Sequence, residues 1–254
     1  MDILTHTISG LVIGTVAAGF SKETGLKKSG IVMAGGIGGC LPDIDAISLW
    51  SGFDATIGKI FGLSVSGHDI YFGTYWYSHH GFFHSLAAIA IYVLLFWIIQ
   101  RLTKNKVAKK PPFNVVTAFA GGYLIHIFED MPTPAGSWGG VNMFWPSSDW
   151  IGGPGQIWWW NNYDIFLIAF TALCLNLIIL SLSTNHKKTG LLTSCCFTFA
   201  LASGFYQINS RGFDFNIQGF QSKEIKSLEI QRKILGDTLY GFMLILDEKV
   251  KVNF

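Results

Sequence analysis

The segment DIFLIAFTALCLNLIILSLS, residues 164–183, decides the fold class of this chain. Its only charged side chain is Asp164, at the very start, and the remainder is mainly apolar. A helix that crosses a membrane needs about 20 consecutive residues of this kind, whereas a buried strand is much shorter. The segment therefore predicts a transmembrane helix.

The composition of the whole chain agrees with a membrane protein. Of the 254 residues, 50% are hydrophobic and 13% are charged, against about 25% charged residues in soluble domains. The net charge of +2 is too small to indicate a nucleic-acid partner, and we expect none. The four cysteines lie in apolar stretches without C-x-x-C spacing, so we expect free thiols rather than a disulfide framework or a thiolate zinc site.

Other apolar stretches extend this pattern to an all-α, polytopic bundle of about six transmembrane helices. The N-terminal stretch lacks a basic leader, so we interpret it as a retained span rather than a signal peptide. Pro42 should end the second helix near Cys40. The expected spans are residues 4–20, 30–49, 83–100, 113–130, 164–183 and 190–207. Glycines in three of them should let helix backbones approach closely: Gly10, Gly14, Gly35, Gly36, Gly38, Gly39, Gly121 and Gly122.

Residues 1–207 are expected to form this bundle, and residues 208–254 a small C-terminal extension outside the membrane. The extension should have mixed structure. GFDFNIQGF, residues 212–220, alternates as a short strand would, and a partly helical spacing follows it.

The basic residues predict the orientation. They collect in three connections, whereas residues 42–82 contain only Lys59 and residues 131–162 contain none. By the positive-inside rule the basic connections face the cytoplasm, and both termini lie outside. The basic residues are Lys22, Lys27 and Lys28; Arg101, Lys104, Lys106, Lys109 and Lys110; and Lys187 and Lys188.

Residue types that bind metals gather at the outer ends of four expected spans. Ionisable side chains at this depth usually face a bundle interior and pair there. Because the orientation came from lysine and arginine alone, this coincidence is independent support for a metal site. The predicted ligands are His6, Asp43, Asp45, His79, His84, His126 and Asp130.

Local spacing supports convergence. On a helix, His126 and Asp130 share one face, as do His80 and His84, whereas Glu129 points about 100° away from Asp130 and is left out. The pair Asp43 and Asp45 should lie on an extended or turn-like segment. Similarly, His79 can reach a centre shared with His84 only if it precedes the helix and Gly81 lets the chain bend. We expect His68 and His186 to be solvated.

Histidine and carboxylate without thiolate suit zinc, manganese or iron. Seven ligands exceed one tetrahedral zinc, which indicates two metals that activate a water and clamp a substrate. Taken singly, the groups have other interpretations. His6 could be an interfacial histidine, Asp43 and Asp45 could be capping carboxylates, and the histidines of residues 79–84 could form a proton relay.

The loop at residues 131–162 follows the site and is rich in glycine, proline and tryptophan. Such a loop is either a functional lid or an aromatic belt at the membrane interface. Candidate substrate contacts are His80, Thr133 and Trp138.

Four motifs resemble the YdjM-like family of inner-membrane proteins, over roughly residues 1–185. They are THTISG (5–10), PDID (42–45), HHGFFHS (79–85) and HIFEDMPTPAG (126–136) with FWP (144–146). The resemblance implies a bacterial inner-membrane location, metal-dependent hydrolysis and the same seven ligands. Relatives usually carry arginine and threonine where this chain has His80 and Phe83, so an arginine contact to phosphate is lost here. A remote similarity to zinc-dependent phospholipase C and single-strand nuclease enzymes implies a phosphoester substrate.

The sequence thus predicts a membrane-bound hydrolase of a phosphoester, with one or two divalent ions at the extracytoplasmic surface, and a lipid-linked phosphoester is one candidate substrate. Zinc is the first choice and manganese the second. Membrane lipid is the expected partner, and the sequence does not define the oligomeric state. The alternative is a non-enzymatic membrane protein whose metal site is structural or regulatory.

Overall fold

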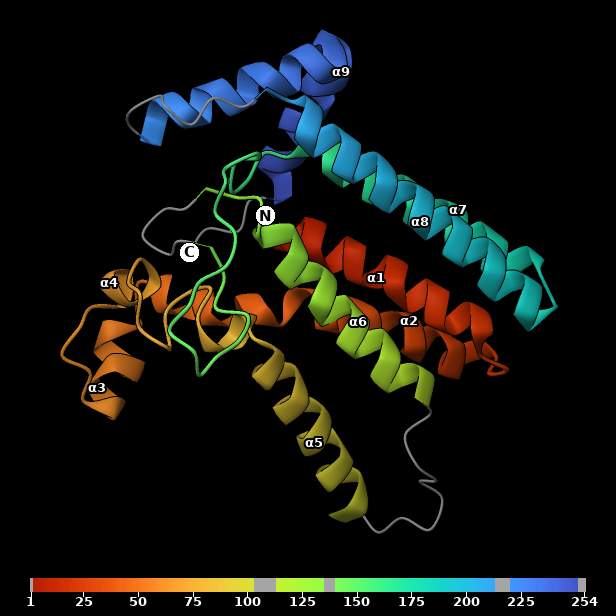
Figure 1. The fold of residues 1–254 in the computed structure, drawn as a ribbon, viewed down its shortest axis with the longest axis horizontal. Coiled ribbons are helices and arrows are strands. Elements are labelled where there is room, and N and C mark those ends of the chain that lie inside the picture. Colours follow the sequence, from red (N-terminus) through yellow and green to blue (C-terminus); the bar gives the residue numbers. More distant parts are fainter. Residues whose placement is uncertain (1, 103–112, 135–139, 213–219, 251–254) are drawn as a thin grey trace.

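The computed structural model describes residues 2–102, 113–134, 140–212 and 220–250, and in these residues the fold is built from helices (Figure 1). Among the same residues, strand pairing is limited to two isolated bridges, Pro134–Pro154 and Val141–Ile151. The elements in order are α1 (Ile3–Phe20), α2 (Gly25–Cys40), η1 (Pro42–Leu49), η2 (Asp54–Gly58), α3 (Lys59–Phe61), α4 (Gly67–Tyr71), η3 (Phe82–His84), α5 (Leu86–Leu102), α6 (Phe113–Asp130), α7 (Tyr163–Leu182), α8 (His186–Ser210) and α9 (Phe220–Val250).

Three helices, α1, α2 and α6, pack with their backbones in close contact, as their glycines predicted. A Cβ atom on Gly35 of α2 would lie 2.6 Å from the backbone nitrogen of Gly14 and would also overlap the carbonyl oxygen of Gly10, both in α1. A Cβ atom on Gly122 of α6 would overlap the carbonyl oxygen of Gly35. Small residues at such contacts let helices approach where lipid offers no hydrophobic drive. The close packing of these three helices therefore fixes the relative positions of the residues at their ends.

Helices α7 and α8 pack against α1, and α9 packs against α7. An apolar cluster joins Ile8 and Val12 of α1 to Phe166 of α7 and Met243 of α9, with α8 also packed against it. A buried polar network fixes α9 to the ends of α7 and α8 at Asp164. That carboxylate pairs with Arg211 and accepts a 2.9 Å hydrogen bond from the Gln231 side-chain amide. The C-terminal helix is therefore packed against the bundle.

The extension differs in part from the prediction. Its described residues form one long helix, α9, which is bent at Gly236 (φ 71°). The alternating stretch predicted as a strand falls almost entirely on residues 213–219, outside the described residues.

The expected count of six spans is not confirmed. Among the described residues, three helices, α1, α7 and α8, are long and apolar enough to cross a membrane, and α2 with η1 adds a fourth if this pair, bent by 47°, is one span. The apolar part of α5 runs from Leu86 to Ile99. It is short because the chain around His84, just before it, is a 3₁₀ turn and not helix. In α6, the polar residues of the last turn lower its hydropathy. Pro42 ends α2 at Cys40, as predicted.

The α1–α2 and α7–α8 connections lie at the same end of the bundle (Figure 1). At this end α1 and α8 are in direct contact, because a Cβ atom on Gly19 of α1 would lie 2.7 Å from the hydroxyl of Thr193 of α8. Lysines lie at this end of both helix pairs, Lys22 between α1 and α2 and Lys187 and Lys188 in the first turn of α8, and the other ends of α1 and α2 carry His6 and the aspartates of η1. Two of the basic connections are thus separated from the predicted metal ligands by the length of the helices.

Replacing Gly35 by alanine should destabilise the protein, because the new methyl group cannot fit between α1 and α2. We expect the free energy of unfolding to fall by about 1–3 kcal/mol, the usual cost of overpacking. The matched control is Gly30→Ala in the same helix, where a Cβ atom meets nothing within 4 Å and alanine is the better helix former. Thermal unfolding in detergent measures both, and equal melting temperatures for the two variants would contradict this packing.

Candidate metal centre

The predicted ligands come from four places that the fold brings to one end of the bundle. His6 lies in the first turns of α1, and His126 and Asp130 in the last turns of α6. Asp43 and Asp45 lie in the first turn of η1, a 3₁₀ helix, which is the turn-like of the two conformations expected. The remaining two come from the loop and 3₁₀ turn before α5. All seven are buried or nearly so.

Four of these side chains point one donor atom each at a common point: Asp43, His84, His126 and Asp130. His84 Nε2 lies 3.1 Å from His126 Nε2. Asp130 Oδ2 lies 3.0 Å from His126 Nε2 and 3.5 Å from His84 Nε2. Asp43 Oδ1 completes the group at 3.5 Å from His126 Nε2 and 3.8 Å from His84 Nε2.

These separations have the size of the edges of a coordination sphere. Zinc binds imidazole nitrogen and carboxylate oxygen at about 2.0–2.2 Å, so ligand atoms at the corners of a tetrahedron lie about 3.3–3.6 Å apart. The measured distances scatter around that value. Two nitrogens that face each other at 3.1 Å can also share a proton, but the two carboxylates beside them add negative charge that a cation balances better. The donor set therefore fits a divalent metal ion.

The other ring nitrogen of each histidine faces an oxygen outside this group. His126 Nδ1 donates to the carbonyl of Gly39 at 2.6 Å. His84 Nδ1 lies 3.3 Å from Asp45 Oδ2, in a geometry that leaves both atoms without a hydrogen bond. Such partners orient a metal-binding imidazole and direct its Nε2 lone pair at the ion. The geometry thus places Asp45 beside the ligands as an orienting group.

His6 contacts the centre through Asp130, with Nε2 3.2 Å from Asp130 Oδ1. On its other side, His6 Nδ1 donates to Glu129 Oε2 at 2.7 Å. The sequence prediction left Glu129 out of the ligands because it lies on another face of α6, and Glu129 is not among the four grouped donors. The face is the one that packs against α1, so the residue next to Asp130 reaches the histidine of the neighbouring helix.

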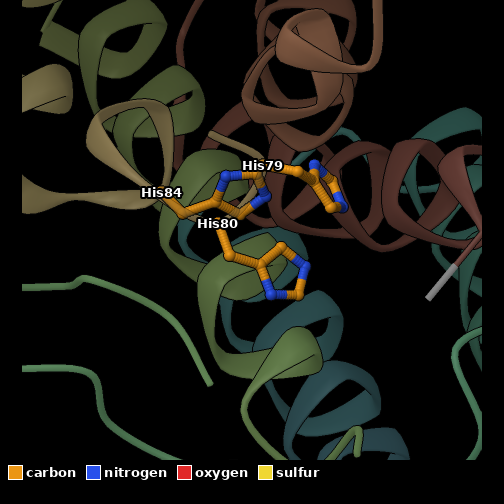
Figure 2. A group of neighbouring side chains, drawn as sticks. All are labelled: His79, His80 and His84. Atoms are coloured by element: carbon orange, nitrogen blue, oxygen red, sulfur yellow. The ribbon is translucent and has the colours of Figure 1, made fainter. Parts of the chain in front are cut away.

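A second group of potential ligands shares His84. The donor atoms of His79, His80 and His84 also lie within 4.8 Å of one another, and their rings crowd together in Figure 2. His79 Nδ1 donates to Asp45 Oδ1 at 2.7 Å, and its ring stacks on Tyr71 at 4.4 Å. The sequence prediction considered His80 for substrate only, whereas its Nε2 lies 3.7 Å from Asp130 Oδ2.

The route by which these histidines converge differs from the one expected. His80 and His84 do not share a helical face, because His80 has a positive φ of 64° and His84 lies in the 3₁₀ turn η3. The bend at Gly81 was predicted correctly. A Cβ atom there would lie 2.6 Å from the carbonyl oxygen of Trp76, so the turn requires glycine.

The loop after α6 covers this second group. His80 Nδ1 donates to the carbonyl of Gly140 at 3.1 Å, and Asn142 N donates to the carbonyl of His80 at 2.8 Å. The buried hydroxyl of Thr133 donates to the backbone carbonyl of Asp130, so it contacts the main chain of a predicted ligand. Trp138, the third candidate substrate contact, lies outside the described residues.

The pKa values of two of these histidines shift in opposite directions. Burial lowers the pKa of His84, but the carboxylates of Asp45 and Asp130 outweigh it and raise this pKa to about 9. Burial, reinforced by the charge of His79, holds the pKa of His80 well below its usual range. At neutral pH His84 is thus protonated without an ion, and a bound metal would displace that proton.

The fold and the site together define a class: an all-helical membrane protein with a buried histidine and carboxylate cluster that can hold a metal ion. A family model described as YdjM inner membrane protein matches residues 1–211. The chain therefore belongs to this family, as its motifs predicted, and the family and the apolar helices both support a membrane location. No curated protein and no solved structure matches the chain.

Replacing Asp45 by asparagine should weaken metal binding without removing it. The amide cannot hold His84 and His79 as the carboxylate does, and loss of an orienting partner costs about 10–100-fold in metal affinity. Zinc titration of the apoprotein measures the change. The control is His68→Ala, because the side chain of His68 is 72% exposed and pairs only with the exposed Asp69. An unchanged affinity in Asp45→Asn would contradict the orienting role.

Proposed function

We propose that the protein is a membrane-bound, metal-dependent hydrolase of a phosphoester. The observation that carries the proposal is the set of four donor atoms from Asp43, His84, His126 and Asp130 at the spacing of a coordination sphere. Zinc is the ion we expect first, and manganese second, because the donors are imidazole and carboxylate. A divalent ion in such a site lowers the pKa of a water toward about 7 and polarises a phosphoryl oxygen.

The protein side chains have separate parts in this proposal. Asp45 and the Gly39 carbonyl hold the two ligand imidazoles in orientation, and His6 holds Asp130. The neutral ring of His80 lies at the edge of the centre under the covering loop, where its Nδ1 donates to the Gly140 carbonyl and its Nε2 is left with a lone pair. Its group with His79 and His84 supports a second ion, since one tetrahedral ion would use only the first four donors.

We further propose that the centre lies at the outer surface of the inner membrane and that the substrate is lipid-linked. Lysines at the opposite end of the helices support the orientation, because basic connections stay in the cytoplasm. Exposed aromatic and aliphatic side chains occur along the chain from η1 to η3, which carries several of the predicted ligands. Among them are Trp50, Ile60, Phe61 and Trp76. Such residues sit well at the level of lipid headgroups.

Purified wild-type protein should contain zinc or manganese, and Asp130→Ala should lose it. Removal of Asp130 takes away the carboxylate that lies between His84 and His126, and the histidines would repel one another if charged. Metal content by mass spectrometry, together with hydrolysis of a soluble phosphodiester, measures the effect, with His68→Ala as the control. Metal-free wild type would end the proposal, and metal retained in Asp130→Ala would reject the ligand assignment.

The second candidate function is a structural or regulatory metal site in a membrane protein that is not an enzyme. One observation favours it: four protein donors fill a tetrahedral ion completely, as in structural zinc sites, whereas catalytic sites keep a position open.

X-ray absorption of the zinc-loaded protein separates the two functions. For the hydrolase, we expect a further oxygen ligand from solvent and metal-dependent hydrolysis that stops when the ion is chelated. For the structural site, we expect only the four protein ligands, no hydrolysis, and a large fall in melting temperature on chelation, because binding free energy then contributes to folding. A closed coordination shell with no turnover would decide against the hydrolase.

A further inference from the structure

A large apolar groove runs along the bundle to the covering loop. Its volume is about 900 Å³, within the range of about 300–1,000 Å³ that small-molecule sites occupy. Its floor is α1, and its walls are α6 on one side and α7 and α8 on the other. Figure 1 shows α6 and α8 on the two sides of α1. The side chains that form the walls are mainly aliphatic and phenyl, including Leu124, Phe128, Ile168, Phe197 and Leu201.

One end of the groove carries the polar side chains Glu129, Gln156 and Asn209 and is bounded by the loop after α6. Pro132 and Pro154 of the covering loop line it there, and a 2.9 Å hydrogen bond from Gln156 to Asn209 joins that loop to α8. A spanning helix of another chain could not continue past this closure. A flexible hydrocarbon chain could end there with its polar head turned toward the loop.

The polar end is also where the groove approaches the metal centre, through Glu129 and His6. Glu129 lines the groove, and the same carboxylate accepts the hydrogen bond from His6, whose other nitrogen contacts Asp130. The mechanism proposed above uses none of the apolar surface. The groove thus connects helices that can cross a membrane with the residues that can hold the ion.

We propose that this groove binds the hydrocarbon chain of the substrate, so that the substrate is an amphiphile whose phosphate head lies at the loop end of the groove, on the side of the metal centre. The inference rests on the proposed function, because it assigns the groove to the substrate of the metal centre. It narrows the substrate class to membrane phospholipids and lipid phosphates, and it excludes soluble phosphoesters as the natural substrates.

Gly204 of α8 offers a way to fill the groove without disturbing the fold. It lines the groove, and a Cβ atom there meets nothing within 4 Å. The variant Gly204→Trp should therefore fold and occupy the space of the chain. The matched control is Gly30→Trp, because Gly30 also has open space around it and lies outside the groove. Leu201→Trp, at an exposed position of the same wall, serves if the first variant does not fold.

The probe is phosphatidic acid with a photoreactive group at the end of one acyl chain, in vesicles with the purified protein. In wild type, we expect the label on peptides of α6 and α8 that line the groove. In Gly204→Trp this labelling should fall by about tenfold or more. The indole would occupy the space of the acyl chain, and the free-energy cost of overpacking corresponds to a loss of affinity of this size. Gly30→Trp should label as wild type, and all variants should keep their metal content.

Labelling that is unchanged in Gly204→Trp, or is spread evenly over all lipid-facing helices, would overturn the inference. Groove residues cross-linked to a second copy of the chain would overturn it too. Failure of the two proposals is distinguishable. Groove-specific labelling of a protein without metal rejects the hydrolase and keeps the chain site. Metal-dependent hydrolysis of a soluble phosphodiester without groove-specific labelling does the reverse.

Discussion

The hydrogen bond from His126 Nδ1 to the carbonyl of Gly39 joins the packing of the helices to the chemistry of the centre. A carbonyl oxygen can only accept, so Nδ1 carries the proton and Nε2 is left to face the centre. The bond forms because α2 and α6 approach so closely that a Cβ atom on Gly38 would overlap the carbonyl oxygen of Phe119. Larger side chains at that contact would separate the helices and remove the orienting oxygen, so the site depends on the glycines as much as on its ligands.

The same arrangement recurs around the cluster with different oxygens. His6, His79, His80 and His126 each direct Nδ1 to a carboxylate or a carbonyl: Glu129, Asp45, Gly140 and Gly39 respectively. The Nε2 atoms of His6, His80, His84 and His126 then lie 3.0–3.7 Å from the oxygens of Asp130. One buried carboxylate therefore faces four imidazoles, an arrangement in which protons or metal ions must balance the charge. A core built only for stability would use apolar residues of the same volume, since these are usually at least as stable.

The sequence predicted much of this because its strongest signals are local. The apolar run at 164–183 became α7, Pro42 ended α2, and the glycines of α1, α2 and α6 marked the close contacts. The gathering of His6, Asp43, His126 and Asp130 at one end followed from the distribution of charge along the chain. The roles of Glu129 and Asp45 could not be predicted in this way. Each depends on the rotation of one element against another, and a periodicity gives the faces of a helix but not which neighbour each face meets.

The groove brings the remaining apolar surface into the same account. Apolar side chains that face lipid gain little by burial against each other, because hydrocarbon tails are equally apolar. A groove between helices in a membrane can thus persist, filled by a lipid chain, where in water it would collapse. Glu129 lies where this groove ends, held by His6 next to Asp130. A lipid chain in the groove would lie along α1, which lines the groove at Val12 and carries His6 nearer its N-terminus. The length of α1 between these two residues would then set how far the lipid head reaches toward the ligands. The helix packing that orients His126 would then also position the substrate.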